Sequence, residues 1–372
     1  MGLTHKAPDH NNPNEEIRIQ AIGCWDTVGA LGIPINPLLQ KWLDLPAFLR
    51  IRHLNWMDTT LTDNVMNAFH ALALDEHRAP FSPAVWEKPK GCDTNLKQVW
   101  FPGAHSGVGG GYDDTATADI SLAWMMDQLS GNSCGQPSPN DIDSWIEFED
   151  DYIGHIHRVN EQWYENNPPS RNWGNGTVFR SLRFPQSLAG MIDRTPGRHR
   201  QLDKVTWKAK GGVLMRDTNE FIHASVRARM DLGGHGPINN PESWSIWSSL
   251  FNLVHKVLGR TGERFYQPSA LKGWELKDGH SAHDDYSINN VEIWKRTGKT
   301  PVWEWKGKDA PVKKNTCLLE DRLGRYELQL LAMYHEVDNL IEASNRGVTS
   351  IESLRELHKQ MQDREDRRSR TI

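Results

Sequence analysis

A short apolar stretch that ends in an acid decides the fold of this chain: Ile17-Arg18-Ile19-Gln20-Ala21-Ile22-Gly23-Cys24-Trp25-Asp26-Thr27-Val28-Gly29. Apolar and polar residues alternate at its start, and the four residues before the acid form a continuous apolar run. This pattern is typical of a β-strand that enters a sheet covered on both faces. We therefore predict a buried strand that ends at Asp26, followed by a turn region rich in Gly and Pro.

A second predicted strand spans residues 96–102 and leads directly into a glycine-rich loop. That loop reads GAHSGVGGGY over residues 103–112, so His105 stands just beyond the strand. An amphipathic helix follows, capped by Thr117 or Asp119 and ending at a glycine. Both predicted strands thus carry a chemically active side chain at their carboxyl ends.

The segment between these strands has helical spacing. Apolar residues recur on one helical face, after potential caps at Thr62 and Asp63, at Val65, Phe69, Leu72 and Ala73. We expect this helix to end near His77. The order strand, helix, strand, helix favours an α/β fold with a mostly parallel sheet.

The rest of the chain is less regular. Asn, Pro and Gly are frequent over residues 132–215, which predicts a long irregular insertion. A strand followed by a helix is expected over residues 213–230, and apolar residues recur at helical spacing over residues 318–343. We expect three segments: a disordered lead-in over residues 1–16, an α/β domain over residues 17–240, and a loop-rich and helical C-terminal extension over residues 241–372.

The composition excludes several classes of protein. The 372 residues contain 43 Lys and Arg and 48 Asp and Glu, a formal net charge of −5, so a basic surface for nucleic acid is not expected. No apolar run is long enough for a transmembrane helix. The cysteines are too widely spaced for a disulfide framework or a zinc knuckle: Cys24, Cys92, Cys134 and Cys317. We expect a cytoplasmic protein without a metal, and we expect most of its 16 tryptophans to serve packing.

Asp26 and His105 are the candidates for chemistry. In an open α/β sheet, ligands and catalytic groups gather at the carboxyl ends of the strands. An aspartate there can orient a catalytic partner, or it can cap the following turn with its own side chain. A histidine there can act as a general base, because it accepts and returns a proton near neutral pH. The chain order, acid before base, is the order in which α/β-hydrolases carry these residues after their nucleophile.

Other motifs carry weaker signals. The glycines of residues 107–111 lack the Lys-Ser/Thr ending of a phosphate loop, and a tyrosine takes the third glycine position of a dinucleotide-binding motif, so no nucleotide cofactor is expected. His155 and His157 would share one face of a strand, but no third metal ligand stands at a supporting spacing. His223 and Ser225 fit a structural hydrogen-bonded pair better than a catalytic one.

Three stretches together resemble the Tle1-like phospholipase domain, also known as the DUF2235 family, which includes bacterial type VI secretion effectors and many fungal proteins. They read CWDTVGALGIP over residues 24–34, ALALDEHRAPF over residues 71–81 and VWFPGAHSGVGGGY over residues 99–112. The resemblance covers roughly residues 17–235.

The resemblance implies an α/β-hydrolase fold and a Ser-Asp-His triad that acts on the carboxylic esters of phospholipids, with no cofactor. Asp26 matches the triad acid of the family's WDTVG motif, and His105 matches the triad base of its G-x-H-S-D-V-G-G-G-Y motif. One residue departs from the pattern: Gly107 stands where the family usually has Asp. We expect this change to loosen whatever the missing carboxylate would hold.

The family's nucleophile is a larger departure. In the family a G-F-S-R-G elbow carries the serine and an early D-G-T motif precedes the oxyanion hole, and both stand before the WDTVG motif. Residues 1–25 contain neither motif. We also expect no serine of the chain to stand in a G-x-S-x-G context. We therefore expect an N-terminally truncated chain, whose sheet lacks the N-terminal strands and which does not hydrolyse esters alone.

Three interpretations remain open from the sequence. The chain is a fragment of an active hydrolase, or a shortened pseudoenzyme that binds a lipid, a protein or an intact homologue, or a protein in which a serine from elsewhere rebuilds the site. A lipid or small ester is the expected substrate if the site is complete.

Overall fold

The structure of the protein is a computed structural model, and it describes part of the chain. The described residues are 18–28, 60–130, 146–149, 151–167, 173–181, 191–202, 209–231, 234, 236, 238, 265–277, 301–307 and 317–334. The expected lead-in, residues 1–16, lies outside them.

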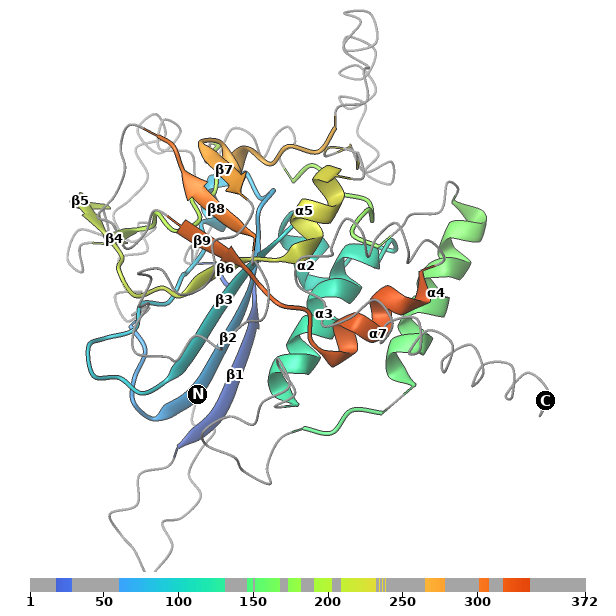
Figure 1. Cartoon of the computed structure of the whole chain (residues 1–372), viewed down its shortest axis with the longest axis horizontal. Coiled ribbons are helices and arrows are strands. Elements are labelled where there is room, and N and C mark those ends of the chain that lie inside the picture. Colours follow the sequence, from blue (N-terminus) through green and yellow to red (C-terminus); the bar gives the residue numbers. More distant parts are fainter. Residues whose placement is uncertain are drawn as a thin grey trace, which may run out of the picture.

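A seven-stranded mixed sheet forms the centre of the described structure (Figure 1). Its spatial order is β1-β2-β3-β6-β9-β8-β7. The first five strands in this order pair in parallel, and β8 and β7 are antiparallel additions at one edge. The α/β class predicted from the sequence is confirmed. The strands are β1 (Ile19–Trp25), β2 (Val65–Ala73), β3 (Asn95–Phe101), β6 (Glu220–Ile222), β7 (Trp274–Lys277), β8 (Val302–Trp305) and β9 (Cys317–Glu320).

The predicted helix over residues 62–77 is wrong, because this segment contains β2, the strand between β1 and β3. Eight of its nine residues are buried, since both faces of the sheet are covered there. Phe69, Ala71 and Ala73 pack on one face, and Leu72 packs on the other. A strand buried on both faces is apolar throughout, and such a run also contains the spacing of a helix.

Helices cover one face of the sheet. Figure 1 shows α3, α4 and α7 together beside β1, β2 and β3, and their apolar side chains share one core cluster with Phe69, Val99 and Phe101. The longer helices are α3 (Ala116–Leu129), α4 (Tyr152–Asn166), α5 (Ala224–Asp231) and α7 (Arg325–Met333). The predicted helix after the glycine-rich loop is confirmed as α3, but its N-cap is Thr115, and the predicted caps Thr117 and Asp119 lie inside the helix.

Loops and short elements cover the other face. Leu72, Trp100 and Ile222 pack there against Tyr266, Leu271 and Trp303. Two short 3-10 helices lie in these covering segments, η2 (Ala79–Phe81) and η5 (Ser269–Leu271). Trp100, Trp124, Trp173 and Trp303 are fully buried, as expected for tryptophans that serve packing.

The regions expected to be irregular contain further regular structure. The stretch over residues 132–215 includes α4 and a separate two-stranded antiparallel sheet made of β4 (Arg200–Leu202) and β5 (Ala209–Leu214). Residues 241–372, expected to be a loop-rich and helical extension, contribute β7, β8, β9 and α7 to the central sheet and its core. The proposed domain boundaries stay a prediction.

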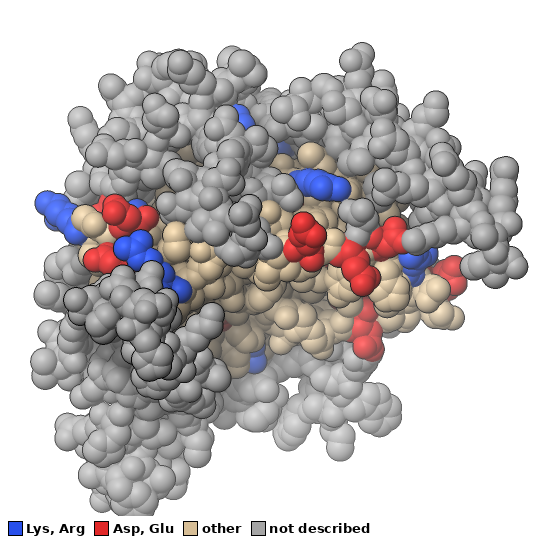
Figure 2. Space-filling view, turned by 90° about the horizontal axis from the view of Figure 1, so that it is seen from below, with Lys and Arg blue, Asp and Glu red and all other residues tan. Residues whose placement is uncertain are grey.

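Charged side chains of both signs lie on the described surface. On the face drawn in Figure 2, Lys and Arg side chains are interspersed with Asp and Glu side chains, and no continuous basic stripe is visible among the described residues. Among the described helices, none is both long and apolar enough to cross a bilayer.

Candidate active site

Asp26 lies directly after β1, at the carboxyl edge of the sheet. Its φ of 41° is in the left-handed region, which aspartate enters more readily than most residues. The backbone N–H of Asp26 still donates to the carbonyl of Ala71, 2.7 Å away, so the chain turns sharply while it stays attached to β2. This turn buries the carboxylate completely against the end of β2.

Three donors hold the two oxygens of this carboxylate. Oδ1 accepts the backbone N–H of Ala73 at 3.0 Å. Oδ2 accepts from Nδ1 of His105 at 2.8 Å and from Nη2 of Arg194 at 2.9 Å. The two residues selected from the sequence are therefore brought into direct contact.

Burial alone would raise the pKa of Asp26. The hydrogen bond from His105, the charge of Arg194 and the N–H of Ala73 outweigh burial, and the pKa of Asp26 is lower than its ordinary value. Asp26 is consequently an ionised, buried acceptor at neutral pH.

His105 begins α2 (His105–Gly109), a short helix that replaces the loop expected over part of the glycine-rich stretch. Its backbone N–H donates to Oε2 of Glu76 at 3.3 Å, and Phe81 meets its ring edge-on with 5.1 Å between the ring centres. The side chain keeps 31% of its surface exposed, whereas the aspartate is covered completely. Because Nδ1 is used by Asp26, Nε2 is the free nitrogen of this ring.

Glu76 and Arg78 support His105 from the loop after β2. The Arg78 guanidinium donates to both oxygens of Glu76 at 2.9 and 2.8 Å, and it lies 3.6 Å from the ring centre of Phe81. Burial raises the pKa of Glu76, but the hydrogen bonds from Arg78 outweigh it, so the pKa is lowered overall. Both residues stand in the ALALDEHRAPF stretch, but their contact with His105 was not predicted.

His70 lies beside Asp26 on the central strand β2. Its Nε2 accepts the backbone N–H of Thr27 at 3.0 Å, and its Nδ1 lies 3.3 Å from Oε1 of Gln98. Burial lowers the pKa of His70 to about 4. His70 is thus a neutral, structural histidine, and it fixes the turn that follows Asp26.

His223 forms a second pair with a carboxylate, deep in the core. Its Nδ1 is 2.7 Å from the hydroxyl oxygen of Ser225 and accepts the backbone N–H of Ser225 at 3.1 Å. Its Nε2 is 2.5 Å from Oε1 of Glu327 on α7. All three side chains are essentially inaccessible to solvent. The expectation of a structural His223–Ser225 pair agrees with this geometry, and Glu327 was not foreseen.

In the described part of the chain, no serine completes the Asp26–His105 pair. No serine hydroxyl among the described residues is hydrogen-bonded to the ring of His105. The expectation that no serine stands in a G-x-S-x-G context is wrong, because Ser133 has this spacing in Gly131-Asn132-Ser133-Cys134-Gly135. In the sequence it follows helix α3 rather than a strand. This residue lies outside the described residues. Its G-x-S-x-G spacing makes Ser133 a candidate nucleophile that a substitution can test.

Gly107 lies buried in α2, where the family usually has Asp. A Cβ built on it would meet only Cε2 of Tyr112, at 4.0 Å. The backbone therefore has room for a side chain at this position. By contrast, Gly103 has a φ of 119°, and a Cβ there would lie 3.1 Å from Cγ2 of Thr117.

His155 and His157 do not share a strand face, because both lie in α4. Residues two apart on a helix point in widely different directions. His155 is exposed, whereas His157 is buried with its ring against Tyr334. This segment is a helix because its apolar side chains recur at helical spacing and pack in the same core cluster as α3 and α7.

The comparisons with known proteins agree with the resemblance seen in the sequence. Residues 3–128 match the family described as T6SS, Phospholipase effector Tle1-like, catalytic domain. The matched range includes Asp26 and His105 and ends within α3, before Arg194. Searches of curated proteins and of solved structures gave no match.

Proposed function

We propose that Asp26 and His105 are the acid and the base of a Tle1-like phospholipase site that acts on the carboxylic esters of phospholipids. The observation that carries this proposal is the 2.8 Å contact between His105 Nδ1 and Asp26 Oδ2, within the residues that match the phospholipase family. The contact joins the carboxyl ends of two parallel strands, as in an α/β-hydrolase.

Each group has a defined role in such a site. The Nδ1–H of His105 donates to ionised Asp26, which fixes the ring and leaves Nε2 as the acceptor. Nε2 would take the proton from an attacking hydroxyl and return it to the leaving alcohol. The partial exposure of His105 suits this role, because the nitrogen must reach the reacting atoms.

No nucleophile for this pair is found among the described residues. The chain contains no G-F-S-R-G sequence, and no described serine contacts His105. In a serine hydrolase, loss of the nucleophile reduces turnover on the order of a millionfold. We therefore propose that the 372-residue chain does not hydrolyse esters by itself, and that an external serine would complete the site.

A non-catalytic binding protein is the second candidate function. The same observation favours it, because a complete acid–base pair without a serine can still contact a lipid or protein partner without chemistry. We propose a cytoplasmic location for either function, since the spacing of the four cysteines in the sequence does not fit a disulfide framework.

Ester hydrolysis by the purified 372-residue protein tests the proposal. With p-nitrophenyl butyrate and a short-chain phosphatidylcholine, we expect the same rate for wild type and His105→Ala, and no labelling by a fluorophosphonate. Hydrolysis that His105→Ala abolishes would overturn the proposed inactivity. Ser133→Ala and Ser106→Ala would then show which serine is used.

Binding distinguishes the two candidate functions. An ether-linked phospholipid, which has no ester to cleave, is titrated into wild type and Asp26→Asn by calorimetry. Binding that the substitution weakens supports a substrate site at the pair. Binding of equal strength in both proteins supports a partner surface elsewhere.

A further inference from the structure

Arg194 makes a contact that neither the sequence motifs nor the family match includes. Its side chain is 1% exposed, and Nη2 lies 2.9 Å from Oδ2 of Asp26. The same oxygen accepts from His105, so the guanidinium and the imidazole share one acceptor atom. Arg194 therefore influences His105 through the carboxylate between them.

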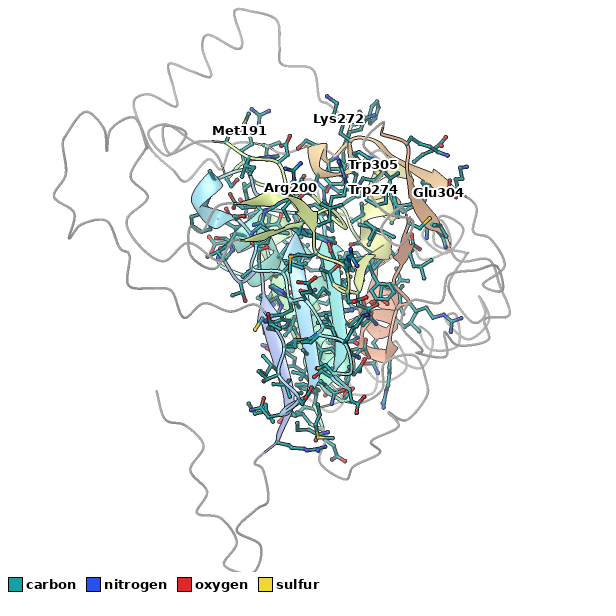
Figure 3. The ribbon with its side chains drawn as sticks, turned by 90° about the vertical axis from the view of Figure 1, so that its left-hand side faces the viewer. Met191, Arg200, Lys272, Trp274, Glu304 and Trp305 are labelled. Carbon is teal, nitrogen blue, oxygen red and sulfur yellow. The ribbon has the colours of Figure 1, made fainter. Side chains whose placement is uncertain are left out.

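The loop that carries Arg194 is anchored on the sheet independently of Asp26. The backbone N–H of Gly197 donates to Oε2 of Glu220 at 2.8 Å, and the ring of His199 stacks on Trp100 with an interplanar angle of 5°. Arg198 lies 3.8 Å from the ring centre of Trp305. Figure 3 shows Met191 and Arg200, which flank this loop, at the end of the sheet where Trp274 and Trp305 lie. The position of Arg194 is thus set by packing.

Asp26 is the anion that this guanidinium contacts. The second amino nitrogen, Nη1, is buried and has no hydrogen-bond partner among the described residues. Two other histidines that interact with Arg194, His70 and His199, are neutral. Burial is the main cause of the lower pKa of each, and the charge of Arg194 lowers it further. Hence Arg194 is a fixed positive charge opposite the buried carboxylate.

The other charges near His105 also cancel. Glu76 accepts the backbone N–H of His105, and Arg78 neutralises Glu76 through two hydrogen bonds. His105 therefore contacts two ion pairs rather than two free carboxylates, one through its ring and one through its backbone N–H. If Arg194 were absent, Asp26 would be an uncompensated anion that favours the protonated ring.

We propose that Arg194 is a positioning residue of the pair: it neutralises Asp26 and orients Oδ2, so that the carboxylate holds the His105 ring in one orientation and is not an uncompensated anion beside it. This inference rests on the proposed function, because only a neutral ring can accept a proton from a hydroxyl. It also extends the site beyond the matched residues 3–128.

An NMR titration of the imidazole nitrogens of His105 in the full chain tests this role. We expect Arg194→Gln to move the titration midpoint to higher pH, about a tenfold gain in proton affinity. Arg194→Lys, which keeps the charge, should restore a midpoint near that of wild type. Arg198→Gln is the matched control, because Arg198 is in the same loop and contacts Trp305 instead.

An unchanged midpoint in folded Arg194→Gln overturns the proposal, even if that variant is less stable. If Arg194→Gln does not fold, the Asp26→Asn single variant is compared with the Asp26→Asn/Arg194→Gln double variant. The double variant leaves no unpaired buried charge. The titration midpoint of His105 should then be lower in Asp26→Asn than in the double variant, because the charge of Arg194 is still present. Equal midpoints in the two variants overturn the proposal. The titration needs no hydrolysis, so its outcome is separate from that of the ester assay.

Discussion

Two histidine–carboxylate pairs occupy very different places in the molecule. His105 and Asp26 meet at the carboxyl edge of the sheet, where the ring is partly exposed and the acid is also paired with Arg194. His223 and Glu327 meet in the core, where neither side chain is accessible and Ser225 occupies the other ring nitrogen. The buried pair contains the three residue types of a catalytic triad, whereas no serine among the described residues contacts the open pair.

The difference shows that residue types alone do not define a site. A buried serine cannot meet an ester, so the His223 array joins β6 to α7 rather than acting on a substrate. Nearby, Asp127 accepts the backbone N–H groups of Tyr326 and Glu327, and burial and the charge of Glu327 raise the pKa of Asp127 well above its ordinary value. The open pair has the access that chemistry requires.

The largest expected effect comes from breaking the buried pair. Glu327→Ala leaves His223 and the Gly324 N–H without their acceptor and should lower the free energy of unfolding by about 3–5 kcal/mol, measured in urea. Glu327→Gln should cost less, because its amide oxygen still accepts. The control is Asp193→Ala at the exposed His77–Asp193 pair, where about 1 kcal/mol or less is expected. Equal losses in Glu327→Ala and Asp193→Ala would contradict a structural role for the buried pair.

A smaller effect is expected from Asp26→Asn at the open pair. The variant should lose about 1–3 kcal/mol of stability at pH 7, because Arg194 then lacks its buried anion. The pKa of Asp26 is lowered in the folded protein, so its contribution is complete above the ordinary aspartate pKa and disappears as the pH falls through the lower folded value.

The difference between wild type and Asp26→Asn should therefore shrink below about pH 4. Asp119 acts in the opposite direction, because burial raises its pKa to about 7 and its ionisation destabilises the folded state as the pH rises. Taking the difference between the two proteins in urea unfolding at each pH cancels this contribution. A difference that grows toward low pH would refute the assigned role of Asp26.

The third effect is a difference in chemical access. Diethyl pyrocarbonate should modify His105 at least about tenfold faster than His223, since a buried group reacts only when the structure opens. Peptide mapping by mass spectrometry follows each histidine separately. Comparable modification rates for the two histidines would mean that the His223–Glu327 pair is accessible to the reagent.

The sequence predicted the residues that stand directly after strands. β1, β3 and α3 were recognised by apolar runs and helical spacing, and Asp26 and His105 by their positions after two strands. β2 was mistaken for a helix, because a strand buried on both faces has no polar alternation.

Contacts between distant parts of the chain were not predictable from local patterns. Arg194 is 168 positions from Asp26, in a stretch without periodicity, and Glu327 is 104 positions from His223. The His223–Ser225 pair was accessible to sequence reasoning because its members are two residues apart. Only the folded sheet brings the other partners together.

The tautomers of the two histidines give the most direct test of the account. In wild type at a pH where both rings are neutral, long-range ¹H–¹⁵N NMR should find the proton of His105 on Nδ1, donated to Asp26, and that of His223 on Nε2, donated to Glu327. This arrangement leaves Nε2 of the partly exposed His105 ring available for the proposed role as a base. A proton on Nε2 of neutral His105 would contradict the proposed acid–base pair.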